Sequence, residues 1–185
     1  MRLEDVARDA PTFDFRAYFG GHVRASGWFA DRFGRPRRHF CGDFVGRLEG
    51  ECLVLDETLH FCDGVTENCV WRVFIDADGQ FLAESESLVD RARVQVKGNA
   101  LAMHYAMRVA TTNGSSPRFD FDDLMLLQPD GSLHDLTQVR KFGFRLGTVC
   151  TQYARHDGQA TCASRRPPVA AADGSAGAPG SSADD

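Results

Sequence analysis

The stretch EGECLVLDETLHFCDG, residues 49–64, has a run of strand length between two turn signals, Glu49-Gly50 and Asp63-Gly64. Glycine adopts positive φ angles without steric cost, and Asp and Asn tolerate them, so such pairs favour tight hairpin turns. Apolar and polar side chains alternate along the run, which is the pattern of a strand with one buried face. The stretch therefore predicts a central strand with an antiparallel neighbour on each side.

The same kind of turn signal recurs along most of the chain, at Asp78-Gly79, Gly98-Asn99 and Asp130-Gly131. The fold class that we expect is all-β, an antiparallel up-and-down β-barrel of about ten strands with a short helical turn over Asp14 to Phe19. The expected strands lie near residues 23–30, 37–48, 51–62, 65–76, 80–88, 91–97, 100–110, 118–128, 133–142 and 145–155. Ten strands exceed the roughly eight whose side chains just fill a barrel, so the interior is either a cavity or a flattened, filled core.

Counting outward from the first two turns assigns a face to each residue of three strands. Glu57 and Arg72 both fall on the face that is rich in Phe and Leu, diagonally across adjacent strands. Because an unpaired buried carboxylate is costly, we expect the two side chains to compensate each other or to meet a polar ligand. The pair is thus an internal salt bridge, a headgroup anchor or, for Glu57, an acid or base.

Two further hairpins add polar candidates to the same interior. Counting around Gly98-Asn99 places Tyr105 on the apolar face, and counting around Asp130-Gly131 places Asp123 there, diagonal to Arg140. If these groups face one cavity, a fatty-acid-like molecule would put its carboxylate at an arginine and its tail among Phe and Met.

The opposite, outward face holds histidines and cysteines. His39 and His60 are expected directly opposite each other, with Cys41 and Cys62 two residues further along their strands. Imidazole and thiolate suit zinc, but the two cysteines fall toward opposite ends of the patch, and no metal or other cofactor is expected.

Trp28, Asp31 and Arg32 lie where the first expected strand ends. Arg32 stacked on Trp28 and paired with Asp31 would close the end of the barrel; alternatively, Trp28 belongs to the mouth of a binding site.

Composition limits the possible partners. The chain has 185 residues and a formal net charge of −5, which argues against nucleic acid or an anionic membrane surface as the main partner. No run approaches the length of a membrane helix and the start carries no apolar signal region, so we expect a cytoplasmic protein without membrane insertion, and its six cysteines to be reduced. The oligomeric state is left open.

The expected division of the chain is an N-terminal arm over residues 1–12, a barrel domain over 13–157 and a disordered tail over 158–185, where Ala, Gly, Ser and Asp dominate.

From Phe15 to Tyr153 the chain resembles the bacterial family called domain of unknown function 3833. The matching pieces are Tyr18-Phe19-x-Gly21, Gly27-Trp28-Phe29-x-Asp31-Arg32-Phe33-Gly34, Leu55-Asp56-Glu57, Asp63-Gly64, Trp71, Gly98-Asn99-Ala100, Asp120-Phe121-Asp122-Asp123 and Lys141-Phe142-Gly143. The resemblance implies a lipocalin-like or calycin-like barrel, and it carries no activity or catalytic residue to transfer. Many relatives begin with an export and lipidation segment, so this chain is either soluble or truncated at its start. Their genes tend to lie near those of fatty-acid-modifying enzymes.

The chain departs from the family at two places. It has Leu124 where relatives usually have an aromatic residue, and Asp135-Leu136 where they have an Asn-Arg pair.

Three functional hypotheses follow. The first is a non-enzymatic barrel that binds a small apolar, fatty-acyl-like ligand through Trp28, Glu57, Arg72, Tyr105, Asp123 and Arg140. The second is an enzyme that acts on a modified acyl chain with Glu57 or Asp123 as acid or base; with no nucleophile or phosphate-binding motif in the sequence, the first hypothesis is favoured. The third is a filled barrel that serves as an assembly partner, with Trp71 and the outer face of histidines and cysteines as its contact surface.

Overall fold

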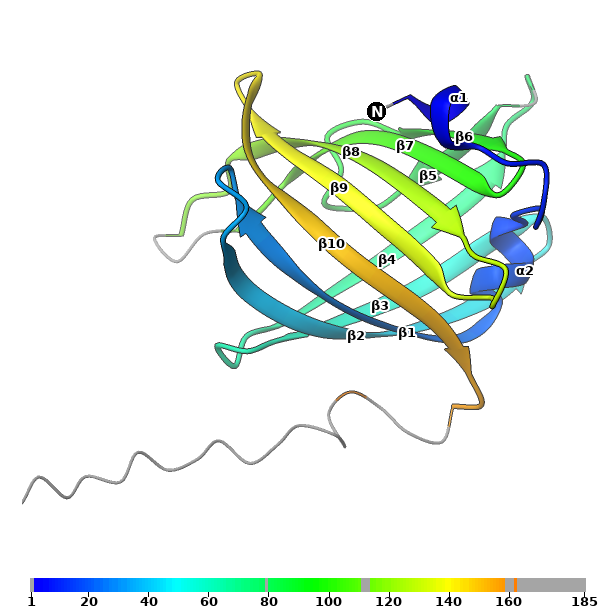
Figure 1. The fold of residues 1–185 in the computed structure, drawn as a ribbon, viewed down its shortest axis with the longest axis horizontal. Coiled ribbons are helices and arrows are strands. Elements are labelled where there is room, and N and C mark those ends of the chain that lie inside the picture. Colours follow the sequence, from blue (N-terminus) through cyan, green and yellow to red (C-terminus); the bar gives the residue numbers. More distant parts are fainter. Residues whose placement is uncertain (1, 79, 111–113, 159–161, 163–185) are drawn as a thin grey trace, which may run out of the picture.

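The computed structural model describes residues 2–78, 80–110, 114–158 and 162, and it is a closed antiparallel barrel (Figure 1). Ten strands in these residues pair in chain order, and β1 pairs with β10 to close the ring. Their bounds are β1 Gly21–Asp31, β2 Pro36–Glu49, β3 Cys52–Phe61, β4 Thr66–Ile75, β5 Phe81–Glu84, β6 Ala92–Lys97, β7 Ala100–Arg108, β8 Arg118–Leu127, β9 Leu133–Lys141 and β10 Phe144–His156. The predicted fold class is confirmed. The predicted tail, 158–185, lies almost wholly outside the described residues.

One end of the barrel is closed by the short helix α2, Phe15–Phe19 (Figure 1). Asp14 caps the helix, since its Oδ1 accepts the backbone N–H of Ala17 at 3.0 Å. Phe19 is buried and packs its ring against Phe44 and Tyr153. We call this end the α2 end, and the opposite end, where the β1–β2, β3–β4 and β9–β10 hairpins turn, the far end.

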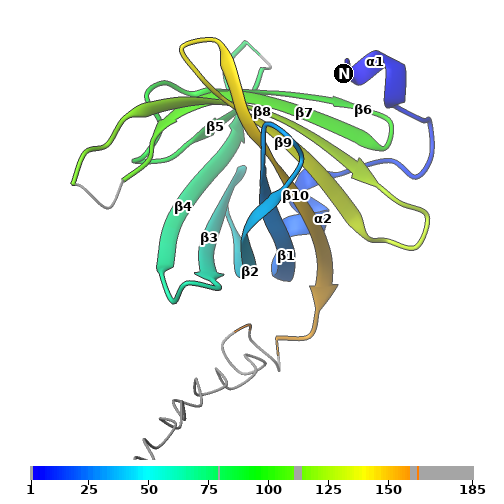
Figure 2. The ribbon, with the colours of Figure 1, turned by 60° about the vertical axis from the view of Figure 1, so that its left-hand side comes forward.

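The N-terminal arm crosses the β6–β7 turn, as Figure 2 shows, and contains helix α1, Leu3–Val6. Arg8 and Asn99 hold it through two reciprocal bonds: the Arg8 N–H donates to Asn99 Oδ1 at 2.7 Å, and the Asn99 N–H donates to the Arg8 carbonyl at 2.8 Å. No helix in the described part of the chain is long and apolar enough to cross a membrane.

The hairpin loops decide which side chains point inward. The β6–β7 turn has two residues, Gly98 and Asn99, as predicted, so its register is the predicted one. The β3–β4 loop has three: the Phe61 N–H donates to the Val65 carbonyl at 2.9 Å, and Gly64 has a φ of +92°. The additional residue moves every residue of β4 to the opposite face.

The β8–β9 loop repeats this arrangement. The Gln128 N–H donates to the Ser132 carbonyl at 2.8 Å, and Gly131 has a φ of +83°. The predicted faces of β4 and β9 are therefore wrong, and those of β3, β7 and β8 are right.

Candidate functional site

Glu57 lies inside the barrel, as predicted, but its partner is Trp71. The Trp71 Nε1–H donates to Glu57 Oε2 at 2.7 Å across β3 and β4. The expectation that Arg72 faces the interior is wrong: Arg72 points outward, its side chain is 49% exposed, and it pairs with Glu49 at 2.9 Å. The prediction that Trp71 lies on an outer contact surface is wrong, because Trp71 is an inward residue.

Asp123 also lies inside, but with different neighbours from those predicted. On β9 it is opposite Thr137, and the next inward residue of that strand is Asp135. The Thr137 hydroxyl donates to Asp135 Oδ2 at 3.0 Å. Arg140 is on the outer face, where its Nε lies 3.2 Å from Asp122 Oδ2, so the predicted Asp123–Arg140 pair does not form.

Tyr105 is inward, as predicted, and belongs to a row of aromatic rings across β4, β7 and β8. It stacks on Phe121 with ring centroids 5.0 Å apart, and Trp71 meets it edge to face at 5.5 Å. The row gives the interior an apolar wall whose polar atoms are the Tyr105 hydroxyl and the Trp71 indole N–H.

Three inward carboxyls lie in this interior, and the described residues pair none of them with a cation. Desolvation raises the pKa of Glu57 to about 7, although the hydrogen bond from Trp71 lowers it. Desolvation likewise raises the pKa of Asp123 to about 7, although the hydroxyl groups of Thr137 and Tyr105 lower it. Burial and the neighbouring Asp123 charge raise the pKa of Asp135 well above its ordinary value. Among the described residues, no Lys or Arg forms an ion pair with any of the three.

Two carboxyl oxygens in this group have no hydrogen-bond partner within the described protein. They are Oδ1 of Asp123 and Oδ1 of Asp135, in side chains that are 6% and 7% exposed. Buried polar atoms are nearly always satisfied, so these two mark a position where a polar group from outside the chain would fit.

Packing differs between the two halves of the barrel. At the α2 end, Phe19, Leu53 and Leu101 are completely or almost completely buried. Toward the far end, inward residues keep part of their accessible surface, among them Leu59 and Phe121. Glu57 is at the boundary: it is surrounded closely enough to be desolvated and is still partly accessible. Solvent therefore reaches inward side chains in the far half, whereas the α2 end is closed.

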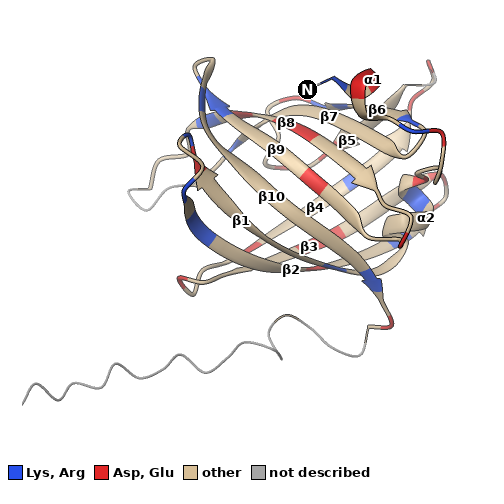
Figure 3. Ribbon diagram, viewed as in Figure 1, with Lys and Arg blue, Asp and Glu red and all other residues tan. Residues whose placement is uncertain are grey.

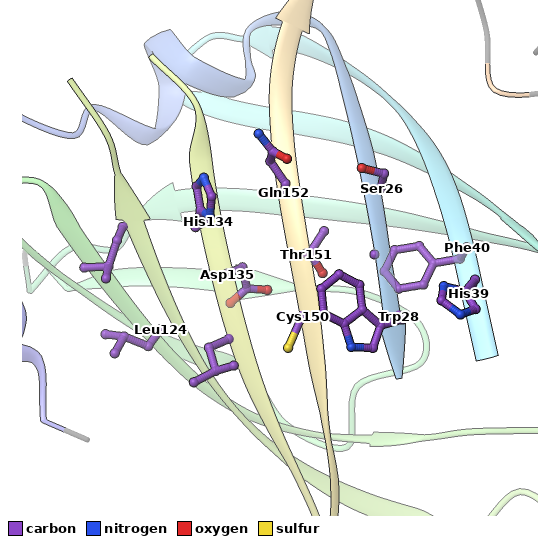
Figure 4. Close-up of a pocket in the computed structure, with 13 residues that line it drawn as sticks. Ser26, Trp28, His39, Phe40, Leu124, His134, Asp135, Cys150, Thr151 and Gln152 are labelled. Atoms are coloured by element: carbon purple, nitrogen blue, oxygen red, sulfur yellow. The ribbon is translucent and has the colours of Figure 1, made fainter. Parts of the chain in front are cut away.

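Trp28 does not line this interior. It faces outward on β1, is 42% exposed, and lies opposite Cys150 of β10. It lines a hollow in the barrel wall with a volume of about 590 Å³. Figure 4 shows Asp135 and Thr151 among the other residues that line this hollow. The predicted stacking of Arg32 on Trp28 is also wrong, because Arg32 lies over the Phe33 ring at 4.7 Å and Asp31 pairs with Arg37 at 2.7 Å.

The outer histidines are not directly opposite each other. The β2–β3 turn is Gly50-Glu51, one position later than predicted, so that His60 lies opposite Cys41 and the His39 carbonyl accepts the Cys62 N–H. Within the described residues, no group of three or more His, Cys, Asp or Glu side chains is placed to hold a metal ion.

A family model described as "Protein of unknown function (DUF3833)" matches residues 1–155. The chain belongs to this family. Among solved structures, it is similar to the crystal structure of Rv2717c from M. tuberculosis, with a TM-score of 0.48 and 13% identity over 76% of this chain and 94% of that chain. No curated protein matches the chain significantly.

In this family member, sequence reasoning missed two interior residues, Trp71 and Asp135. A one-residue error in each loop placed them outside. A signal was nevertheless present at Asp135, because Asp135-Leu136 is one of the two places where the chain departs from the family pattern. The structure puts that departure among the interior carboxyls.

Proposed function

We propose that the barrel interior binds a small, largely apolar molecule, with its polar group deep inside and its acyl-like chain directed toward the far end. The observation that carries this proposal is the pair of buried, unpartnered oxygens, Asp123 Oδ1 and Asp135 Oδ1. Leaving a buried acceptor unsatisfied costs about 1–3 kcal/mol, which a bound polar group would recover.

The apolar part of the ligand would lie against the partly accessible side chains above the carboxyls. Leu59 and Phe121 offer such a wall on β3 and β8, whereas the Phe61 ring is covered by the Arg38 guanidinium at 3.4 Å. Pockets for small molecules combine a mostly apolar lining with a few convergent polar groups, and this half of the interior has that composition.

The polar group is expected to be a hydrogen-bond donor, and an ammonium group fits best. A fatty-acid carboxylate would bring another negative charge beside Glu57, Asp123 and Asp135, and the arginines once expected to receive it are outside. An ammonium would instead supply donors to the unpartnered oxygens and a charge opposite to that of the ionised carboxyls.

Three probes with the same chain length test both parts of the proposal. Dodecylamine, dodecanol and dodecanoate would each compete with an apolar fluorescent dye, at concentrations below micelle formation. We expect the amine to bind most tightly and the acid least. The preference for the amine over the alcohol should grow between about pH 6 and pH 8, because the carboxyls with pKa values of about 7 ionise in that range.

Matched variants sharpen the result. Glu57→Gln and Asp123→Asn should each reduce the preference for the amine, whereas Arg72→Gln, on the outer face, should leave all three affinities unchanged. Failure of every probe to bind would reject interior binding, and tightest binding of dodecanoate would reject the assignment of the polar group while keeping a binding function.

An enzyme that acts on such a ligand is the second candidate. It is favoured by the neighbouring carboxyls of Asp123 and Asp135. Desolvation raises the pKa of Asp123 to about 7, which suits proton transfer near neutral pH, and burial together with Asp123 raises the pKa of Asp135 well above its ordinary value. Mass spectrometry of the bound probe over hours would show a new product with the natural protein and none with Asp123→Asn. A ligand recovered unchanged together with normal binding would leave binding as the function.

A further inference from the structure

Two neighbouring hairpin tips at the far end carry exposed apolar side chains. Because β1 pairs with β10, the β1–β2 and β9–β10 turns lie side by side, and the Arg145 Nη2–H donates to the Arg32 carbonyl at 3.3 Å between them. We call their residues the hairpin patch: Arg32, Phe33, Arg35, Lys141, Phe142, Phe144, Arg145 and Leu146.

The exposure of the aromatic residues is high. Phe33, Phe142 and Phe144 are 70%, 85% and 77% exposed, and Leu146 is 37% exposed. Single exposed apolar residues are ordinary on protein surfaces, but a group of them on adjacent tips is typical of an interaction surface.

The cations of the patch are not neutralised by carboxylates. In the described part of the chain, no ion pair involves Arg32, Arg35, Lys141 or Arg145, and the nearby Asp31 is taken by Arg37 at 2.7 Å. Arg32 instead lies over the Phe33 ring, and Lys141 lies 5.5 Å from the Phe142 ring centroid. Figure 3 shows the basic residues at these tips. The patch is therefore locally positive, although the chain as a whole has a net charge of −5.

Phe142 is held in an unfavourable backbone conformation. It has a φ of +52° in the two-residue turn Phe142-Gly143, and it is the one non-glycine residue with positive φ among those described. Asn, Asp or Gly is preferred at this position of such a turn, and a bulky side chain is disfavoured. An 85% exposed ring in a strained turn contributes little to folding, which favours a role outside the fold.

We propose that the hairpin patch docks the far end of the barrel on an anionic lipid surface. Exposed Phe side chains would enter the headgroup region while the unpaired Arg and Lys side chains meet lipid phosphates and other anionic headgroups. A second copy of the chain is a poorer occupant, because a two-fold contact would bring the same cations face to face. This inference does not depend on the proposed function, since it rests on the outer tips alone.

The location of the patch gives docking a consequence for the interior. Lys141 also lies 5.2 Å from the ring centroid of Phe119, an inward residue at the far end of β8. Docking would thus set the accessible half of the barrel against the lipid surface.

Vesicle co-sedimentation of the full chain tests the proposal. We expect binding to vesicles of phosphatidylcholine with phosphatidylglycerol, weaker binding to phosphatidylcholine alone, and a loss with added salt. The triple variant Arg32→Gln, Arg35→Gln, Arg145→Gln should weaken partitioning roughly fivefold for each cation removed. The triple variant Phe33→Ser, Phe142→Asn, Phe144→Ser should weaken it at least about tenfold.

Leu48→Ser provides the matched control, because Leu48 is a 59% exposed apolar residue at the α2 end. It should leave partitioning unchanged. Absence of binding to the mixed vesicles, equal binding to both vesicle types, or equal loss with Leu48→Ser would each overturn the proposal. So would a change of sedimentation coefficient in the Phe variant without any change in vesicle binding, which would identify the patch as a contact between copies.

Discussion

Within the part of the chain that the structure describes, Glu57 accepts a hydrogen bond from Trp71 Nε1 and pairs with no cation. Desolvation outweighs that bond and raises its pKa from 4.5 to about 7. A partner arginine would have lowered the pKa. Because Trp71 rather than Arg72 lies beside Glu57, the pKa shift of this carboxyl has the opposite direction from the expected one. It becomes a group that is protonated in mildly acidic solution and ionises near neutral pH.

Glu57→Gln should therefore change how stability depends on pH. The folded pKa is above the unfolded one, so the contribution of Glu57 to stability is complete below about pH 4.5 and is lost as the pH rises to about 7. Glutamine keeps an acceptor for Trp71 and does not ionise. We expect the variant to match the natural protein near pH 4.5 and to be more stable at pH 8, by of the order of 3 kcal/mol.

Urea unfolding at intervals between these pH values measures the difference. Glu86→Gln, at an exposed position, serves as the control and should follow the natural protein throughout. If the free energy of unfolding depended on pH in the same way for Glu57→Gln and for the natural protein, Glu57 would not be desolvated.

At the scale of elements, the turns determine the site more than the strands do. Gly98 illustrates this in the β6–β7 turn: it has a φ of +55°, and a Cβ there would lie 1.9 Å from the carbonyl oxygen of Arg8. The same turn therefore needs glycine both for its own conformation and for the approach of the N-terminal arm.

Gly98→Ala should cost about 3 kcal/mol or more of unfolding free energy, since conformational strain adds to a clash with backbone. Gly143 has a similar φ of +79° and open space around its Cβ position, so Gly143→Ala should cost only about 1–2 kcal/mol. Urea unfolding gives both values, and proteolysis reports whether the arm detaches. Equal costs would mean that the arm does not press on the turn.

The β9–β10 turn allows the opposite effect. Phe142→Asn replaces a bulky residue at positive φ by one that tolerates it, so unfolding free energy should rise by about 1 kcal/mol. Phe144 is also exposed but begins a strand without positive φ, and Phe144→Asn should bring no such gain. The gain would be visible in urea unfolding; a loss of stability would show that the Phe142 ring supports the fold.

These turns also explain how far the sequence could predict the structure. Gly-Asn at 98–99 is a two-residue turn, and counting from it placed Tyr105 correctly. Asp63-Gly64 and Asp130-Gly131 instead end three-residue loops in which only the glycine has positive φ. An Asp-Gly pair fits both loop lengths, so the strands and their order were predictable, whereas the faces of β4 and β9 were not. For this reason the sequence placed Arg72 and Arg140 in the site, although they face outward, and it missed Trp71 and Asp135, which face inward.

At the scale of the whole molecule, the two ends of the barrel interior differ: the α2 end is a packed core, and the rest of the interior holds the candidate site. Aromatic side chains of the N-terminal segment fill the α2 end, where Phe13 and Phe19 are 2% and 1% exposed. The three carboxyls lie above this packing, and the far half keeps accessible side chains. A barrel of ten strands is wide enough for such a division, because its plug occupies only one end.

Comparison of Phe19→Ala with Phe121→Ala tests the division directly. Phe19 contacts four aromatic rings in the filled end, so its truncation should leave a cavity and cost about 3–5 kcal/mol. Phe121 stacks on Tyr105 but is partly accessible, so its truncation removes less buried surface and should cost about 1–2 kcal/mol. Urea unfolding at one pH measures both, with dye binding as a second readout that should change for Phe121→Ala. If the two substitutions cost the same and neither alters dye binding, the barrel is packed uniformly from end to end and its far half is core.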